Sequence, residues 1–196
     1  MDEINSALIK RIEKYTMASV TPDRYAHSMR TAGTAIKLCT IYGEDAQKGY
    51  LAGIAHDMCK DMGGSFLQSL SQQSGYEPTE IEKKKNSLLH GRAASIILKN
   101  EFGIHDSGIL EAVCHHTFGK KDMSNLARII YIADKIEPGR PHMTGDYFDK
   151  LIKMPLDRLL FHIVQENIEY LREQGKEVAI TTLEFYESLQ EGAFNV

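Results

Sequence analysis

The sequence predicts an all-α fold in one compact domain, 1–196, and three observations lead to this prediction. Apolar residues recur at helical spacing along nearly the whole chain, and no run alternates apolar and polar residues as a half-buried strand does. Residues that favour helix starts and helix ends lie between the periodic segments. The chain contains no internal repeat and no low-complexity linker that would mark a second domain.

Two helices are expected before Gly43. The second begins at Thr21-Pro22, because threonine suits the N-cap and proline suits the first helical position, and it runs to Gly43. His27 lies within the first two turns of this helix. The first helix presents one apolar face, which consists of Ile4, Leu8, Ile12 and Tyr15.

A third helix is expected after Asp45, whose carboxylate suits an N-cap. Gly63-Gly64 breaks the chain beyond it, so the pair His56-Asp57 lies near the C-terminus of this helix. Its core-facing residues are Tyr50, Leu51, Ile54 and Met58.

The segment 65–86 is more polar and predicts a short helix followed by a mobile connection at the rim of a pocket. Thr79 and Glu82 within it resemble a capping box. The lysine run 83–85 is typical of a solvated helix face, so we leave it out of the candidate site.

Three helices are expected in the middle of the chain. The first covers 87–102, is entered at His90-Gly91 and is closed by Gly103. Asp106 suits the cap of the next helix, which carries His116 at its end. The third, 125–136, is strongly apolar and places Asp134 just before a turn, where a carboxylate requires a cation.

The C-terminal part is expected to be less regular at first. Residues 141–153 show little periodicity and are predicted to cross the mouth of the pocket. Pro155 then starts a long amphipathic helix that ends near Gly175. Thr181 with Glu184 suggests a capped final helix.

Composition limits the class of partner. A formal charge of −4 and a pI near 6.1 argue against a surface for duplex nucleic acid, so we expect a small-molecule partner. No segment resembles a signal peptide or a membrane span, so no membrane association is expected. Cys39, Cys59 and Cys114 are too few for a disulfide framework, which indicates a reducing, cytoplasmic location.

The pair His56-Asp57 is the most informative feature of the chain. An adjacent imidazole and carboxylate suit one divalent transition metal, which turns water into hydroxide near neutral pH. Four further polar anchors are spaced around the pair, namely His27, His90, His116 and Asp134. The pattern therefore predicts a metal-dependent hydrolase.

Other reactive residues receive a structural interpretation. His105, His142 and His162 lie in polar or irregular stretches and are expected at the surface. His115 neighbours His116, but adjacent residues on a helix point about a quarter turn apart, so both are not expected to face one pocket.

The chain resembles the HD-domain metal phosphohydrolases through the order His27, His56-Asp57, Asp134. Longer segments narrow the resemblance to the YqeK-type symmetrical bis(5'-nucleosyl)-tetraphosphatases. These segments are Arg24-Tyr25-Ala26-His27-Ser28, Ala55-His56-Asp57-Met58-Cys59-Lys60, Leu88-Leu89-His90-Gly91, His116-Thr117-Phe118-Gly119 and the stretch 131–140, which ends in Ile-Glu-Pro-Gly-Arg.

The resemblance implies a helical HD fold with a metal-binding core at about 22–140, and C-terminal helices at about 155–190 that close the pocket. It implies one iron ion, ferrous or ferric, with another divalent transition metal as the alternative. The implied reaction is hydrolysis of diadenosine tetraphosphate at its middle to give two ADP. The implied metal ligands are His27, His56, Asp57 and Asp134.

Further roles follow from the resemblance and from residue chemistry. The catalytic candidates are Asp57, Lys60, His90 and His116. A protonated His90 or His116 would donate to the departing ADP, and the choice between them stays open. The substrate-binding candidates are His27, Asp57, Met58, Cys59, Lys60, His90, His116, Thr117, Asp134, Arg140 and Thr181.

Three alternatives stay open. The same site could act on another nucleotide, such as a deoxynucleotide, a nucleoside monophosphate or a cyclic dinucleotide. A nucleotide-sensing module, in which the metal only organises the pocket, would bind ADP without turnover. A purely structural helical protein would tolerate His56→Ala and Asp134→Ala. The sequence leaves a homodimer open.

Overall fold

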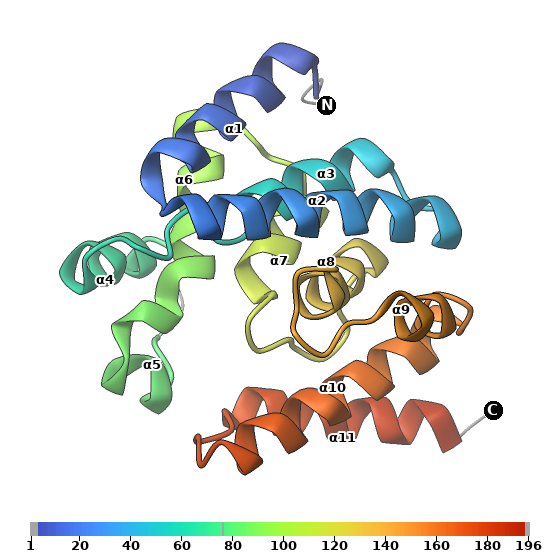
Figure 1. The fold of residues 1–196 in the computed structure, drawn as a ribbon. Coiled ribbons are helices and arrows are strands. Elements are labelled where there is room, and N and C mark those ends of the chain that lie inside the picture. Colours follow the sequence, from blue (N-terminus) through green and yellow to red (C-terminus); the bar gives the residue numbers. More distant parts are fainter. Residues whose placement is uncertain (1–3, 76, 195–196) are drawn as a thin grey trace.

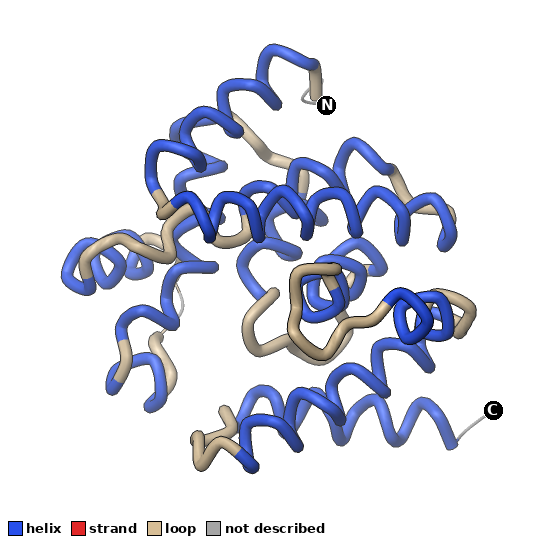
Figure 2. The backbone as a smooth tube through the Cα atoms, in the orientation of Figure 1, coloured by secondary structure: helices blue, strands red, loops and turns tan. Residues whose placement is uncertain are grey.

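The protein is represented by a computed structural model that describes residues 4–75 and 77–194. These residues form helices and connecting loops, and none of them lies in a strand (Figures 1 and 2). In chain order the helices are α1 (Ser6–Ser19), α2 (Pro22–Tyr42), α3 (Ala46–Ala55), α4 (Gly64–Gln72), α5 (Glu80–Lys84), the 3-10 helix η1 (Asn86–Leu89), α6 (His90–Phe102), α7 (Ser107–His115), α8 (Asn125–Ile136), α9 (Gly145–Leu151), α10 (Leu156–Glu173) and α11 (Ile180–Phe194). The predicted all-α class is confirmed.

Helix α2 is the central element of the fold. It packs along α3 on one side and against α8 on another, and α7 lies between α6 and α8. Figure 1 shows α10 and α11 side by side as an orange and red pair, and α10 also contacts α8. Within residues 4–75 and 77–194, no helix has the length and apolarity needed to cross a membrane.

The contact between α2 and α3 depends on a glycine. A Cβ at Gly53 would lie 2.7 Å from the Cα of Ala32, which is closer than real Cβ atoms approach another atom. The two backbones therefore pack at a distance that only small residues permit. This close packing brings the end of α3, where His56 lies, next to His27 on α2.

Most predicted helix boundaries are confirmed, because they depend on local chemistry. The carboxylate of Asp45 accepts hydrogen bonds from the backbone of α3, and that of Asp106 accepts one from Ile109 N at 3.0 Å. Gly43 and Gly103 end α2 and α6 with φ of 75° and 67°, in the left-handed region that glycine adopts without strain.

The segment 65–86 contains two helices, α4 and α5, where one short helix was predicted. Thr79 and Glu82 form the capping box that opens α5. Arg92 of α6 then holds the buried Glu82 carboxylate, with its Nε 2.9 Å from Oε1. A capped helix with a buried ion pair therefore occupies the last part of the expected connection.

The prediction of an irregular segment at 141–153 is also wrong in part. Thr144 caps α9 through a hydrogen bond from Tyr147 N to its side chain, and the buried Leu151 anchors the helix to the core. The predicted cap at Thr181 is wrong as well, since α11 begins one residue earlier, at Ile180. Thr182 instead donates its hydroxyl to the carbonyl of Phe118 at 2.9 Å.

Candidate metal centre

Four imidazole rings form a row through the middle of the molecule. The centroid of His27 lies 5.2 Å from that of His56, His56 lies 4.8 Å from His116, and His116 lies 4.9 Å from His90. Each ring meets the next edge to face. The row thus brings together all four histidines that the sequence singled out.

Three of these rings belong to residues at helix ends, and all three are buried. His56 and His116 are the C-caps of α3 and α7, and His90 is the first residue of α6. Gly91 permits this meeting, because a Cβ there would lie 2.9 Å from the carbonyl oxygens of Val113 and Cys114 and 3.1 Å from His116 Cε1. The predicted helix start at His90-Gly91 is therefore the point where α6 packs closely on the end of α7.

Backbone and side-chain oxygens hold the Nδ1 atom of every ring. In three rings the acceptor is the carbonyl oxygen three residues earlier, so that His56 bonds Gly53 at 2.7 Å, His90 bonds Ser87 at 2.8 Å and His116 bonds Val113 at 2.8 Å. Nδ1 of His27 lies 3.0 Å from Oε1 of Glu137. Because Nδ1–H is the donor in each case, Nε2 is the atom presented to the centre of the row.

The atoms at one end of the row fit a shared ion. Nε2 of His27 lies 3.3 Å from Nε2 of His56 and 3.1 Å from Oδ1 of Asp134. Nε2 of His56 lies 3.7 Å from the same Oδ1 atom. Nitrogen and oxygen ligands about 2.0–2.2 Å from one ion lie roughly 3–4 Å from each other. The donor set therefore has the type and spacing that a divalent transition metal requires.

A second donor group overlaps the first. It consists of His56, Asp57 and His116, whose ligand atoms all lie within 4.8 Å of one another. Oδ2 of Asp57 is 3.9 Å from His56 Nε2, while its Oδ1 faces His90 at 3.0 Å and His116 at 3.6 Å. The four predicted ligands thus divide between two overlapping groups that share His56, and His116 joins the residues that could hold a metal.

The Asp57 carboxylate is buried, and the residue is 5% exposed. Burial alone would raise the pKa of this carboxyl, but the nearby His56, the contacts of its oxygens with His116 and His90, and the Lys60 charge together hold the pKa well below its usual range. Nζ of Lys60 lies 3.8 Å from Oδ1 of Asp57 and 3.1 Å from Nε2 of His90. A cation therefore stands beside the donors at the His90 end of the row.

Asp134 has two further cations at its carboxylate. Lys135 Nζ lies 3.2 Å from Oδ2, and Arg140 Nη2 lies 2.7 Å from Oδ1. Burial raises the pKa of Asp134, and the Lys135 charge with the His27 and His56 contacts lowers it well below its usual range. Arg140, predicted as a substrate contact, thus also holds a predicted metal ligand in place.

The two candidate proton donors are both buried. Burial lowers the pKa of His116 to about 3, against the opposing hydrogen bond to Asp57. Burial likewise lowers the pKa of His90, and the nearby Lys60 charge adds to this effect. The neutral ring is the form that the structure favours at both positions, while the role of general acid stays a prediction.

The remaining predicted contacts divide into two groups. Thr117 joins the site, with Oγ1 3.3 Å from His90 Nε2 and 3.2 Å from His116 Nε2. Met58 and Cys59 are each 0% exposed, because the turn after α3 directs both side chains into the core, and their place among the substrate-binding residues stays a prediction. Thr181 lies in the first turn of α11, and its buried hydroxyl bonds no partner among the described residues.

Three supporting residues were not singled out by the sequence reasoning. Glu137 bonds His27 and also accepts from Arg30 Nε at 2.5 Å. Arg24 Nη1 reaches Oδ2 of Asp57 at 3.2 Å. Glu137 directly follows the apolar helix that carries Asp134, so the same sequence signal, a carboxylate that needs a cation, applies to it.

The histidines predicted to lie outside the site do so. His105 and His142 are exposed, and His162 is half-buried beside Tyr147, whose hydroxyl lies 2.9 Å from its Nε2. Burial and the Lys120 and Arg92 charges lower the pKa of His115 to about 4, and none of the described metal-donor groups includes it.

Comparisons with known proteins agree with this geometry. Residues 24–139 match the family model described as HD domain. The chain is 34% identical to a symmetrical bis(5'-nucleosyl)-tetraphosphatase of Staphylococcus aureus, covering 83% of this chain and 84% of that protein. It is 28% identical to the Bacillus subtilis protein of the same description, covering 89% and 93%.

A solved structure extends the agreement to the fold. The crystal structure of a predicted HD superfamily hydrolase involved in NAD metabolism, from Clostridium acetobutylicum, superposes with a TM-score of 0.85 at 34% identity, covering 93% of this chain and 97% of that one. The shared fold, the matched domain and the buried histidine and aspartate donors lead to one conclusion. The chain belongs to the HD-domain family of metal phosphohydrolases and is related to its symmetrical bis(5'-nucleosyl)-tetraphosphatases.

Proposed function

We propose that this protein hydrolyses diadenosine tetraphosphate symmetrically, giving two molecules of ADP. The observation that carries the proposal is the row of buried imidazoles with Asp57 and Asp134 beside it and Lys60 at one end. The relatives described as symmetrical bis(5'-nucleosyl)-tetraphosphatases support the choice of substrate and of cleavage position.

The metal would be held by His27, His56, Asp57 and Asp134, and we propose one iron ion as the occupant. When bound, the metal supplies a Lewis acid and an activated water at neutral pH. Glu137 fixes the orientation of the His27 ring, and Gly53 O fixes that of His56, so the donors are positioned before the ion binds.

Cations of the chain would bind the phosphate oxygens. Lys60 stands at the His90 end of the row, and the Thr117 hydroxyl lies beside it within 3.3 Å of His90 Nε2. Arg140, whose side chain is 36% exposed, stands beside Asp134 at the other end. Fixed positive charge next to a polyphosphate stabilises the charge that develops on its oxygens during cleavage.

The C-terminal helices would cover the substrate. Thr182 binds the turn that follows Thr117 through the carbonyl of Phe118, and Tyr131 of α8 packs edge to face on Phe185 of α11. We propose a metal-binding core at 22–140 in a single HD domain, with α10 and α11 closing the pocket over it.

Product analysis tests the function. The metal-loaded protein is incubated with diadenosine tetraphosphate under ferrous supplementation, with a chelated control and a parallel panel of mononucleotides. Metal-dependent formation of ADP alone is the expected result. Paired AMP and ATP would show asymmetrical cleavage and overturn the proposed reaction, and consumption of a mononucleotide alone would reassign the substrate. Bound metal without any turnover would favour a nucleotide-sensing module.

A further inference from the structure

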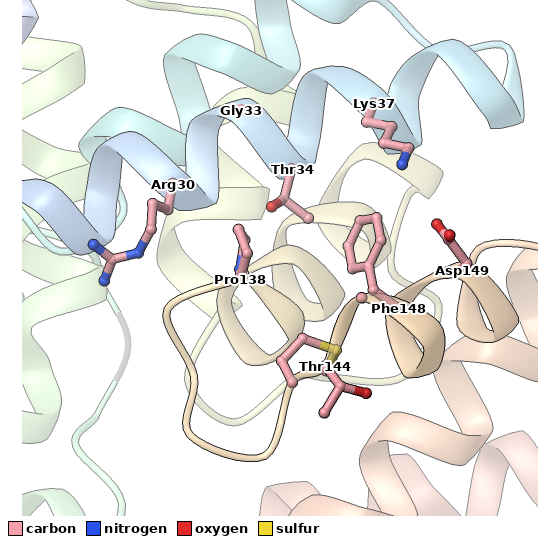
Figure 3. Close-up of a pocket in the computed structure, with 10 residues that line it drawn as sticks. Arg30, Gly33, Thr34, Lys37, Pro138, Thr144, Phe148 and Asp149 are labelled. Carbon is pink, nitrogen blue, oxygen red and sulfur yellow. The ribbon is translucent and has the colours of Figure 1, made fainter.

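A cavity of about 420 Å³ lies beside the metal centre, between α2 and the segment that leads into α9 (Figure 3). Thr34 and Lys37 project toward it from α2, Arg30 lines its end nearer the metal centre, and Pro138 and Phe148 face α2 from the other side. This volume falls within the range of small-molecule sites. None of the roles assigned above uses the cavity.

A polar stripe connects this cavity with the metal centre. His27, Arg30, Thr34 and Lys37 follow one another at spacings of three or four residues, so they share one face of α2. At 1.5 Å per residue the stripe extends about 15 Å along the helix from His27 to Lys37. The cavity therefore begins one turn beyond a predicted metal ligand.

The cavity lies at the opposite end of the row from Lys60. Lys60 and Thr117 stand at the His90 end, whereas Arg30 meets His27 through Glu137, with Arg30 Nε 2.5 Å from Oε2. A substrate cleaved at its midpoint extends equally to both sides of the metal. One half placed toward Lys60 directs the other half along α2 toward the cavity.

The walls of the cavity suit a nucleoside. Phe148 and Met143 supply apolar surface of the kind on which a base stacks, and Lys37 already lies 4.5 Å from the centroid of the Phe148 ring. Arg30 at the inner end has a side chain 39% exposed, which suits contact with a phosphate oxygen. The Thr34 hydroxyl between them is a partner for a ribose hydroxyl.

We propose that this cavity binds the second nucleoside diphosphate half of the dinucleoside tetraphosphate. The inference rests on the proposed function, since it assigns the half of the substrate that extends away from Lys60. The Phe148 face stacks the base, Thr34 meets the ribose, and Arg30 with Lys37 provides the positive charge along the stripe.

The variant Gly33→Leu fills the cavity without disturbing the helix. Gly33 lines the cavity in the middle of α2, and a Cβ there meets no atom within 4 Å. Leucine is also a better helix former than glycine, so folding is expected to be retained. Thr40→Leu is the matched control, because Thr40 is exposed on the same helix and lies outside the cavity.

A milder variant, Lys37→Gln, removes one charge from the cavity wall. Lys10→Gln is its control, because Lys10 is exposed on α1 and is not among the residues that line the cavity. Both variants keep the length of the side chain nearly unchanged, so a difference between them reports the charge at position 37.

Steady-state kinetics on two substrates provide the first test. With diadenosine tetraphosphate, Gly33→Leu is expected to raise KM by about tenfold or more, as loss of a stacked base would do. With adenosine 5'-tetraphosphate, which has one nucleoside, KM is expected to match that of the Thr40→Leu control. An equal rise with both substrates, or no rise with either, would overturn the assignment.

Calorimetric titration with ADP separates this inference from the proposed reaction. The metal-loaded wild type is expected to bind two equivalents of ADP per chain and Gly33→Leu one. One equivalent in the wild type, or two in Gly33→Leu, would overturn the cavity assignment. Two equivalents in a wild type that forms no ADP from diadenosine tetraphosphate would instead overturn the reaction and leave the cavity as a nucleotide site.

Discussion

Oε1 of Glu137 lies 3.0 Å from Nδ1 of His27, although 110 positions separate the two residues in the sequence. Burial lowers the pKa of His27, but the contacts with Asp134 and Glu137 outweigh it, so the net pKa is raised. A carboxylate on Nδ1 directs Nε2 toward the other donors and makes the ring a stronger ligand.

This relationship predicts that Glu137→Gln weakens metal binding. An amide still accepts a hydrogen bond but carries no charge, so metal affinity is expected to fall by about 10- to 100-fold. Competition with a chromophoric chelator measures the change. Glu80→Gln is the control, because Glu80 is exposed on α5. Unchanged affinity in Glu137→Gln would show that the contact is only structural.

Asp134→Ala is expected to reduce bound metal and activity more strongly than Arg140→Ala. Asp134→Ala should remove bound metal and ADP formation together, because Oδ1 lies 3.1 Å from His27 Nε2. Arg140→Ala should raise KM and also reduce metal content, since Arg140 Nη2 bonds the Asp134 carbonyl and carboxylate. Metal analysis of the purified variants measures the metal content of each. A metal-loaded, active Asp134→Ala protein would contradict the site, and Asp157→Ala on the surface is the control.

Lys60→Met should lower kcat by about 100-fold or more while metal content stays unchanged, because a fixed donor beside developing charge acts mainly in the transition state. Lys60 contacts His90 and Asp57 but is not among the donors that could hold the ion. Single-turnover formation of ADP gives the rate, and metal analysis gives the content. Loss of metal in this variant would mean that Lys60 supports the donors rather than the substrate.

Alanine substitution is expected to have opposite effects on stability at two helical glycines. Gly91→Ala is expected to destabilise the protein by about 1–3 kcal/mol, because its Cβ would meet two carbonyl oxygens at 2.9 Å. Gly33→Ala is expected to stabilise it by about 1 kcal/mol, because the added methyl group enters open space in the middle of α2. Urea denaturation measures both values, and equal effects would contradict the packing of α6 on α7.

The stability should depend on pH through Asp106. Burial raises the pKa of this carboxyl. The Lys48 Nζ, which lies 2.7 Å from Oδ2 of Asp106, and the hydrogen bond from Ile109 N outweigh burial and lower the pKa below 3.8. A lowered folded-state pKa gives stability that is present above pH 3.8 and is lost as pH falls through the folded value. Asp106→Asn keeps an N-cap but not the charge, so its unfolding free energy should fall less between pH 5 and pH 3. Equal losses in both proteins would contradict the assignment.

Local chemistry explains why most helices were predictable. Asp45 and Asp106 cap the helices that directly follow them, and Gly43 and Gly103 end helices through their own φ angles. These signals act within a few residues, so the sequence displays them. The helix α9 was missed because it is seven residues long and depends on burial of Leu151 against distant parts of the chain.

The sequence by itself determined the all-α class, the residue types of the metal donors and the resemblance to a family. Only the tertiary structure decided that His116 stands among the donors, that Arg140 and Lys135 hold Asp134, and that Met58 and Cys59 face the core. The reason is physical. A helix end or a donor type depends on neighbouring residues, whereas a distance between side chains depends on how separate helices pack, and that packing is fixed by the whole core at once.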